Sequence, residues 1–231
     1  MQTIGEIVLD VTPAPLPRRQ TLQGRFVSIE PLDPLAHADA LYAGTHGDDR
    51  EELWRYLFEG PFPDRSSFDG YLHEQASSED PIFFAIVDRT TGRAVGQAAY
   101  LRAEPVHKVI EVGHIIFTAK LQRTVGATEA MFLMAQHVFE LGYRRYEWKC
   151  NARNAPSVRA AQRLGFTFEG IFRQHLIVKG RNRDTAWFSM LDMEWPDRKA
   201  NFERWLDQDN FDQHGRQKLS LTELNASSSK N

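Results

Sequence analysis

The sequence predicts a mixed α/β domain in which an antiparallel part of a sheet is joined to a strand–helix–strand crossover. Two apolar runs at residues 82–87 and 94–101 flank a polar turn at 88–93, which predicts a β-hairpin. Further along, an apolar stripe with helical spacing at 125–141 is followed directly by a short strand pattern at 145–150. Strands and helices in this order are typical of a sheet that helices cover.

The N-terminal part of the chain predicts one strand and three short helices. Pro13, Pro15 and Pro17 alternate within residues 1–23, where they discourage regular structure and favour an extended arm. Polar and apolar residues alternate over 25–29, which predicts the first strand. Short helices are expected after it, at residues 34–43, 51–57 and 66–76.

The central part predicts a further strand at 109–117 and a long helix at 125–141. Gly142 directly follows this helix and predicts its end. The apolar side of the helix is formed by Ala127, Ala130, Met131, Met134, Val138 and Leu141. Because a strand is expected again at 145–150, the chain crosses back to the sheet in this part.

The C-terminal part predicts a second crossover helix, a hairpin and a last helix. A helix is expected at 154–164, with Pro156 in its first turn and Gly165 at its end. Strands at 166–178 and 183–194 follow, joined by a turn at 179–182, and a helix at 199–206 comes after Pro196. We therefore expect one domain at 24–196 between the arm at 1–23 and a C-terminal helix and polar tail at 197–231, with 226–231 disordered.

Composition argues against several classes of partner. The 231 residues are 42% hydrophobic, which suffices for one domain with a sizeable core. Twenty-eight Lys and Arg residues against 31 Asp and Glu give a net charge of −3. This near-neutral balance gives no electrostatic reason to expect nucleic acid or an anionic membrane as the main partner.

Localisation is expected to be cytoplasmic, without a membrane partner. No apolar run approaches the ~18–20 residues of a membrane span. Glu6 and Asp10 precede the basic pair Arg18 and Arg19, which is the wrong order of charge for a secretory signal. Cys150 is the single cysteine, so no intrachain disulfide can form, and a lone thiol fits a reducing compartment.

Residues 122–130, Gln-Arg-Thr-Val-Gly-Ala-Thr-Glu-Ala, begin the segment in which the sequence becomes specific. They are followed by Asn154-Ala155-Pro156-Ser157, then by Leu164-Gly165-Phe166 and Glu169-Gly170, with Gly113 before this run and Asp184 after it. In order and spacing, these pieces resemble the motifs of the GNAT superfamily of N-acetyltransferases. The Thr-Glu-Ala and Asn-x-x-Ser pieces resemble its RimJ/RimL-like branch of ribosomal-protein N-terminal acetyltransferases. The likeness covers roughly residues 24–195.

The resemblance implies a GNAT fold, with a mixed, mostly antiparallel central sheet flanked by helices and with central strands that splay apart. It also implies acetyl-CoA as the cosubstrate and no metal. The implied reaction is direct attack of a primary amine, either a protein N-terminus or a small-molecule α-amine, on the thioester. The expected partners are acetyl-CoA and this acceptor, and a homodimer stays open.

In the family, the loop before the long helix binds the CoA pyrophosphate through backbone N–H groups at the helix N-terminus. Val125 stands where the family has its first glycine, but backbone donors require glycine only if φ is positive or the ligand lies against Cα. Arg123 and Thr124 can add a charge and a hydroxyl. An ordinary helix N-terminus without a ligand is the alternative. The resemblance assigns this contact to Gln122, Arg123, Thr124, Val125, Gly126, Ala127 and Thr128.

The pantetheine arm of the cofactor is expected between the splayed strands, where the resemblance assigns it to Ile115, Ile116, Phe117 and Asn154. Gly113 inside a strand predicts a bulge or close packing. In the family, a bulge there points an N–H group at the thioester carbonyl. Asn154 at a helix start has a second interpretation as an N-cap, and the two roles are compatible.

Ser157 and Glu111 are the candidate catalytic residues. Ala161 stands where many GNAT enzymes have a tyrosine, so we expect Ser157, on the same helix, to hydrogen-bond the leaving sulfur. Ser157 has a second interpretation as a local cap group. Lys149 occupies the position where an acidic residue is usual, which leaves Glu111 on the preceding strand to accept the amine proton, directly or through water.

The acceptor is expected to be an α-amine. The pKa of an α-amino group is near ~8 and that of a lysine side chain near ~10.4, so more of the α-amine is neutral without a strong base. A CoA-binding sensor without catalysis and a protein-interaction module are the alternatives to an enzyme. Two sets of residues each have two interpretations. The basic hairpin set is either solvated or a rim that attracts an anionic or carboxylate-bearing substrate, and it consists of Arg173, Lys179, Arg181 and Arg183. The aromatic set either lines the acceptor side or belongs to the core, and it consists of Trp54, Tyr56, Phe58 and Phe62.

Overall fold

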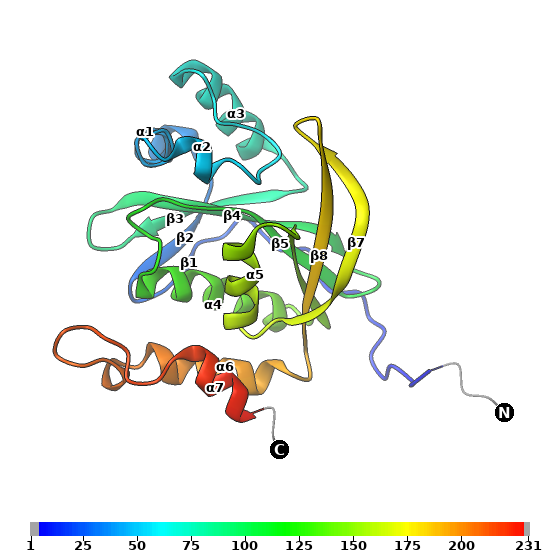
Figure 1. Ribbon diagram of the computed structural model, residues 1–231. Helices are drawn as coiled ribbons and strands as arrows, with labels where there is room; N and C mark the ends of the chain where they lie inside the picture. Colours follow the sequence, from blue (N-terminus) through cyan, green and yellow to red (C-terminus); the bar gives the residue numbers. More distant parts are fainter. Residues whose placement is uncertain (1–4, 229–231) are drawn as a thin grey trace.

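The computed structural model describes residues 5–228, and its centre is an eight-stranded sheet (Figure 1). The strands in chain order are β1 (Leu22–Gln23), β2 (Val27–Pro31), β3 (Ile82–Asp88), β4 (Arg93–Glu104), β5 (Val109–Phe117), β6 (Arg145–Asn151), β7 (Thr167–Val178) and β8 (Arg181–Leu191). Across the sheet their order is β1-β2-β3-β4-β5-β6-β8-β7. Neighbouring strands run antiparallel except β5 and β6, which are parallel.

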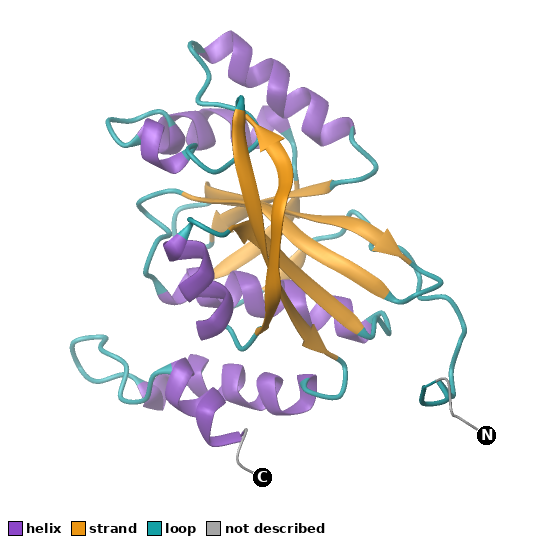
Figure 2. Ribbon diagram, turned by 45° about the vertical axis from the view of Figure 1, so that its right-hand side comes forward, coloured by secondary structure: helices purple, strands orange, loops and turns teal. Residues whose placement is uncertain are grey.

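Helices cover both faces of the sheet (Figure 2). They are α1 (Pro34–Thr45), α2 (Arg50–Leu53), α3 (Arg65–Ser77), α4 (Val125–Glu140), α5 (Ala155–Arg163), α6 (Trp195–Leu206) and α7 (Leu221–Ser228), with a 3-10 turn at Gln208–Asn210. The first three helices lie over one face of the sheet, and α4 and α5 lie over the other (Figure 1). Helices α6 and α7 form an outer layer that packs on α4 and α5.

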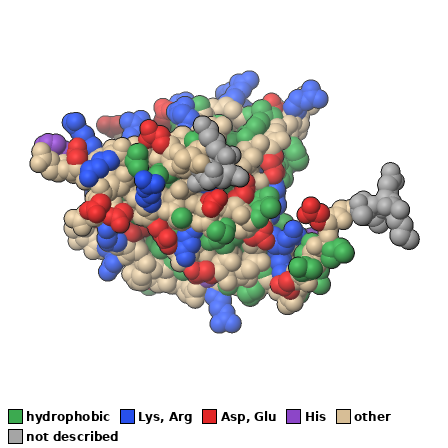
Figure 3. All heavy atoms as spheres, turned by 90° about the horizontal axis from the view of Figure 1, so that it is seen from below, with side chains coloured by type: hydrophobic (Ala, Val, Ile, Leu, Met, Phe, Trp, Pro, Cys, Tyr) green, Lys and Arg blue, Asp and Glu red, His purple; other side chains and the backbone are tan. Residues whose placement is uncertain are grey.

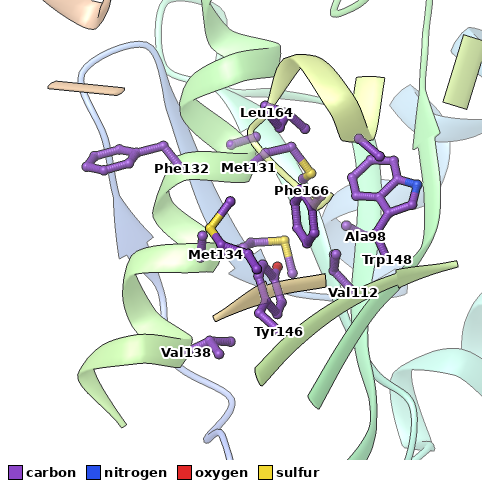
Figure 4. Close-up of a cluster of buried hydrophobic side chains, with 14 of the residues drawn as sticks. Ala98, Val112, Met131, Phe132, Met134, Val138, Tyr146, Trp148, Leu164 and Phe166 are labelled. Atoms are coloured by element: carbon purple, nitrogen blue, oxygen red, sulfur yellow. The ribbon is translucent and has the colours of Figure 1, made fainter. Parts of the chain in front are cut away.

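The larger core lies between the sheet and α4. Met134 and Val138 of α4 are fully buried and meet Tyr146 of β6, while Trp148 and Phe166 complete the cluster (Figure 4). Burial of each such side chain contributes roughly 1.5–3 kcal/mol, so this face fixes α4 against the sheet. The start of α4 and the central strands are held in place by this packing.

The opposite core lies beneath α1 and α3. Trp54, Phe68 and Leu72 are completely buried there against β3. The indole N–H of Trp54 donates to the carbonyl oxygen of Thr45 at 3.0 Å, which satisfies its one polar group. Trp54, the first of the four aromatic residues considered for the acceptor side, is therefore a core residue, and Phe62 packs on its ring edge-on, with centroids 5.3 Å apart.

Glu129 of α4 anchors the N-terminal strands. Its carboxylate accepts from the backbone N–H groups of Arg25, Phe26 and Val27 at 2.8, 2.6 and 2.8 Å. A Cβ at Gly24 would lie 2.6 Å from the same carboxylate, so this turn needs glycine for close approach. In the segment that resembles the family's Thr-Glu-Ala, the glutamate therefore holds the fold together.

The predicted fold class, a mixed and mostly antiparallel sheet flanked by helices, is confirmed. Strand β5 has the predicted bounds, and α4 ends one residue before the predicted end. The helix expected at 51–57 ends at Leu53, because the next residue, Trp54, turns into the core. Pro196 does not break the chain before a helix at 199, because it occupies the first turn of α6, where a missing N–H costs little.

The C-terminal end differs from the expected polar tail. Helix α7 includes residues 226–228, so the expectation of disorder is wrong for them, and residues 229–231 lie outside the described part. Leu221 and Leu224 cause this difference, because both side chains are buried in the larger core. Residues 5–21 of the N-terminal arm have no helix or strand, and the last two residues of the expected arm form β1. The backbone N–H of Ala14 donates to the carbonyl oxygen of Pro105 at 3.1 Å.

Candidate functional site

The two parallel strands at the centre of the sheet separate along their length. Four residue pairs join β5 and β6, from Val109–Arg145 to Val112–Trp148. Past Val112, the paired residues of β5 have their partners on β4, and past Trp148 those of β6 have theirs on β8. The central strands therefore open at their carboxyl ends, as the resemblance implied, and such ends are where α/β sheets bind ligands.

A β-bulge lies in the opened half of β5. Gly113 pairs with Ala99 and Ile116 with Gln97, so His114 and Ile115 together span a single residue of β4. His114 has a positive φ of 49°, which marks the irregular position of the bulge. The bulge expected from Gly113 is thus present and follows that glycine directly. A Cβ on Gly113 would also lie 3.0 Å from Leu101 Cδ2, so close packing contributes as well.

The last three residues of β5 divide between the two faces of the sheet. Ile116 is buried in the core beneath α1 and α3, whereas Ile115 and Phe117 are half-buried against the core on the α4 side. The Gln122 side-chain amide donates to the Phe117 carbonyl oxygen at 2.8 Å. This bond ties the end of β5 to the loop before α4.

The N-terminus of α4 presents backbone donors beside the end of β5. Thr124 is the N-cap, and its hydroxyl accepts from the Ala127 N–H at 3.2 Å. The other N–H groups of a first helical turn have no acceptor inside the helix, and here these belong to Val125 and Gly126. Gln122, Arg123 and Thr124 are exposed, and the backbone of Arg123 has a positive φ of 60°. Such a turn attracts an anion.

Two residues assigned to the cofactor loop have structural roles. Gly126 is buried, and a Cβ on it would lie 3.0 Å from Val27 Cγ1, so this glycine permits close packing of α4 on β2. Thr128 is also buried, and its hydroxyl accepts from Arg163 Nη1 at 3.0 Å, which links α4 to α5. The side chains of the loop that are open to a ligand are therefore those of residues 122–125 and 127, and Gly126 offers only its backbone N–H.

The start of α5 brings together both residues of its Asn-x-x-Ser motif. Asn154 is the N-cap, since its Oδ1 accepts from the Ser157 N–H at 3.2 Å. Trp148 of β6, which the sequence analysis missed, donates its indole N–H to Ser157 Oγ at 3.0 Å. Because an indole N–H is a donor only, Ser157 accepts this bond and can still donate its own hydroxyl hydrogen. Cys150 lies beside this hydroxyl, and burial raises the pKa of its thiol.

Glu111 lies in a buried ionic network. Lys149 Nζ is 2.9 Å from Glu111 Oε2 and 2.7 Å from Glu147 Oε2, and Arg102 Nη1 is 3.1 Å from the same Glu111 oxygen. Burial raises the pKa of Glu111, and the neighbouring Lys149 ammonium opposes this shift. Lys149 also lies 3.8 Å from the centroid of the Trp187 ring. The strand register pairs Glu111 with Glu147, and Lys149 is the cation that both carboxylates share. Glu147 also pairs with Arg145, whose Nε lies 2.6 Å from its Oε1.

Ser157 and Glu111 lie on opposite faces of the sheet. Neighbouring residues of a strand point to opposite faces. Trp148 contacts Ser157 on the α5 side, so Lys149 and its partner Glu111 lie on the side of α1 and α3. The two faces meet where β5 and β6 stop pairing, beyond Val112 and Trp148. The alternation on β6 could have identified Trp148 from the sequence once α5 was placed.

Phe58, from the aromatic set, contacts the bulge on the face of the sheet that carries Glu111. The rings of Phe58 and His114 lie 5.9 Å apart, and Phe83 packs edge-on against His114 at 5.0 Å. Burial lowers the pKa of His114 to about 4, and the charges of Arg102 and Arg183 act in the same direction. His114 is therefore neutral near pH 7. Tyr56 donates its hydroxyl to a backbone carbonyl before α5, at residue 153.

Residues 5–228 lack two further classes of feature. This part of the chain has no group of three or more His, Cys, Asp and Glu side chains arranged to hold a metal ion. Its helices include none long and apolar enough to cross a membrane.

On the face that carries α6 and α7, acidic and basic side chains are interspersed (Figure 3).

Comparison with known proteins identifies the family. A family model described as an acetyltransferase (GNAT) domain matches residues 27–167. A GCN5-related N-acetyltransferase from Brucella melitensis is 48% identical, with a TM-score of 0.93 over 95% of this chain and 100% of that one. A probable acetyltransferase of the GNAT family from Chromobacterium violaceum ATCC 12472 is 40% identical, with a TM-score of 0.79 over 85% and 98% of the two chains.

More distant relatives share the fold. The uncharacterized N-acetyltransferase p20 of Bacillus licheniformis is 24% identical over 112 residues, which are 48% of this chain and 63% of p20, so less than two thirds of that protein is matched. The structure of RimL, a ribosomal L7/L12 α-N-protein acetyltransferase, is 17% identical, with a TM-score of 0.65 over 76% and 98% of the chains. The self-immunity acetyltransferase MccE, in complex with acetyl-CoA and AMP, is 18% identical, with a TM-score of 0.64 over 73% and 93%. On the match over residues 27–167, the chain belongs to the GNAT family of acetyltransferases.

Proposed function

We propose that this protein is an acetyl-CoA-dependent N-acetyltransferase whose acceptor is a primary amine, namely a protein N-terminus or a small-molecule α-amine. The observation that carries the proposal is the opening of β5 and β6 beside the capped N-terminus of α4. This arrangement combines a strand edge of β5 that is free of β6 with backbone donors for an anion. The similar fold of MccE, which binds acetyl-CoA, supports the same cosubstrate.

The residues around the opening fit a CoA molecule. Arg123 and the first-turn N–H groups of Val125 and Gly126 would bind its pyrophosphate. The described backbone of β5 at 115–117 lacks a partner strand on its β6 side, so it can pair with the amide-containing pantetheine arm. Bound acetyl-CoA supplies an activated acetyl thioester, and the remaining work belongs to side chains of the chain. Asn154 would fix the start of α5 near this arm.

The side chains on the two faces have separate tasks in this proposal. On the α5 face, Ser157 donates a hydrogen bond to the sulfur as negative charge develops there, since its oxygen already accepts from Trp148. On the other face, Glu111 accepts the proton that the amine loses, directly or through water. The ammonium of Lys149 disfavours a second positive charge nearby, which lowers the pKa of a bound amine and favours its neutral, nucleophilic form.

Finer assignments follow from the motifs. We place the chain in the RimJ/RimL-like branch on its Thr-Glu-Ala and Asn-x-x-Ser pieces, with a cytoplasmic location, and leave a homodimer as an option. The test is release of CoA thiol from acetyl-CoA across a panel of N-terminal peptides, amino acids, polyamines and lysine side chains. Peptides and α-amines are expected to react best. If spermidine is the best acceptor, the α-amine assignment is wrong, and if acetyl-CoA binds without turnover, the chain is a sensor.

A further inference from the structure

Arg183 is a buried cation on the acceptor side of the sheet. The sequence placed it on a basic hairpin with three other cations, yet its side chain is only 7% exposed. It lies at the start of β8 and shares its strand face with Thr185 and Trp187. Because Trp187 pairs with Lys149, this face is also the face of Glu111.

The guanidinium of Arg183 lacks a partner among residues 5–228. Its Nε and Nη1 atoms are buried and have no hydrogen-bond acceptor in that part of the chain. The described carboxylates form no ion pair with it either, although Glu111 is close enough for its charge to act on Arg183. Glu111 is already bound by Lys149 and Arg102. A buried, unpaired charge is costly, so the Arg183 guanidinium requires a partner that the described residues do not supply.

Phe58 connects Arg183 to the bulge of β5. The guanidinium carbon lies 4.7 Å from the centroid of the Phe58 ring, and the same ring lies 5.9 Å from that of His114. Stacking on Phe58 holds the guanidinium plane but satisfies none of its N–H groups. The unpaired donors therefore lie near the point where the strands open, which is where the proposed function places the amine.

We propose that the acceptor carries a carboxylate as well as its amine, and that Arg183 binds this carboxylate. The inference rests on the proposed function and names the substrate class of the same site. A guanidinium presents two parallel N–H donors that match a carboxylate, and the pair is strengthened where water is excluded. The carboxylate can be the α-carboxylate of a free amino acid or an acidic side chain at the start of a peptide.

The experiment compares acceptors that differ only in the carboxylate. One pair is alanine and alaninamide, and the other is Glu-Ala-amide and Gln-Ala-amide, each measured as kcat/KM with wild type, Arg183→Gln, Arg183→Lys and Arg181→Gln. Arg181 is the matched control because it is an exposed cation on the same hairpin. For each acceptor, the wild-type kcat/KM is divided by the variant kcat/KM. This ratio does not depend on the pKa of the amine, because both enzymes act on the same amine. The pair that discriminates identifies which source of carboxylate the site accepts.

The Arg183→Gln protein is expected to lose roughly 10–100-fold in kcat/KM for the carboxylate acceptor, mostly through KM, and little for the carboxamide. Arg183→Lys should recover part of this loss, and Arg181→Gln should resemble wild type. The melting temperature of Arg183→Gln should not fall, since the structure assigns this side chain no polar partner within residues 5–228. Equal losses for both members of each pair would overturn the proposal.

A binding measurement that needs no turnover tests this inference separately from the proposed function. Calorimetry in the presence of CoA measures N-acetylalanine against N-acetylalaninamide, which needs no turnover. Carboxylate binding that disappears in Arg183→Gln supports the subsite even if the enzyme turns over none of the acceptors, in which case the proposed function alone fails. If the enzyme turns over the amides but Arg183→Gln leaves carboxylate binding unchanged, the proposed subsite alone is overturned.

Discussion

Trp148 donates its indole N–H to Ser157 Oγ at 3.0 Å, and this bond fixes the hydroxyl at the start of α5. One lone pair of the serine oxygen accepts this bond, while the hydroxyl hydrogen can point to a sulfur near the opening of the strands. This geometry gives a physical reason why a residue without a useful acidic pKa can assist a leaving thiolate. A thiol with a pKa near ~8.5 leaves readily, so a hydrogen bond suffices.

The Ser157→Ala protein should therefore have a kcat lower by roughly 10–100-fold, with nearly unchanged affinity for acetyl-CoA. Steady-state kinetics and calorimetry measure the two quantities. Ser66→Ala is the matched control, because Ser66 is an exposed serine in the first turn of α3. An unchanged kcat in Ser157→Ala, with chemistry shown to be rate-limiting, would reduce Ser157 to a structural residue of the helix start.

Replacement of Arg123 by glutamate should weaken acetyl-CoA binding. The reason is that Arg123 is exposed at the N-terminus of α4, where a negative charge would repel the pyrophosphate. Calorimetry should show the weaker binding of Arg123→Glu at low ionic strength and a smaller difference in high salt. Arg204→Glu on α6 changes the net charge equally and should bind as wild type does. Equal affinities of the two variants would argue against a phosphate contact at this loop.

The Lys149→Met protein should be unstable at neutral pH. Removal of the ammonium takes away the cation that the buried carboxylates of Glu111 and Glu147 share, and leaves Glu111 only Arg102 and Glu147 only Arg145. The loss is expected to approach the roughly 3–5 kcal/mol of a broken buried ion pair. Lys199→Met removes an exposed lysine that pairs with Glu203 at 3.8 Å, and it should change stability by less than about 0.5 kcal/mol. Chemical denaturation of both variants measures the difference.

The stability of Lys149→Met should also depend on pH in a defined direction. Burial already raises the pKa of Glu111, and loss of the ammonium raises it further. A carboxyl group with a raised pKa in the folded state binds its proton more tightly there, so stability is highest below the unfolded pKa of ~4.3 and falls as pH rises. The free energy of unfolding of Lys149→Met should fall further below that of wild type at about pH 8 than at about pH 5. A deficit independent of pH would show that packing, not charge, is lost.

Glu129→Gln should lower stability without weakening acetyl-CoA binding. The carboxylate accepts three backbone N–H groups at residues 25–27, whereas an amide has one oxygen and turns its NH₂ group toward such donors. A loss of roughly 2–3 kcal/mol is expected from bonds to a charged acceptor. Glu140→Gln on the same helix is exposed and should be neutral. Weakened cofactor binding in Glu129→Gln at a temperature where it is folded would assign this residue to the site.

Much of the fold was predictable because its signals are local. The apolar run of β5 and the stripe of α4 have clear periods, and Asn154 and Pro156 begin α5 by ordinary capping rules. Helix α7 was missed because two leucines in a polar segment produce little periodicity, and their burial depends on contacts with α6. Local patterns do not report which distant element covers a segment.

Less of the candidate site was predictable, since it depends on strand register and on burial. The ammonium of Lys149 pairs with Glu111 across two strands that are far apart in sequence. Arg183 belonged to a hairpin that looks solvated, and only the folded sheet buries its guanidinium. Gly126 resembled a phosphate-loop glycine, but its lack of a side chain is required by Val27 of β2. The roles given to Ser157, Glu111 and the cofactor loop stay predictions.

The most direct test of the account is transfer of an isotopically labelled acetyl group from acetyl-CoA to an α-amine, with the product identified by mass spectrometry. The account predicts that the label appears on the amine nitrogen of the acceptor in equal amount to the CoA released, and that Ser157→Ala slows both together. Release of CoA without labelled acceptor, or the absence of both while acetyl-CoA binds, would contradict N-acetyltransfer by this chain.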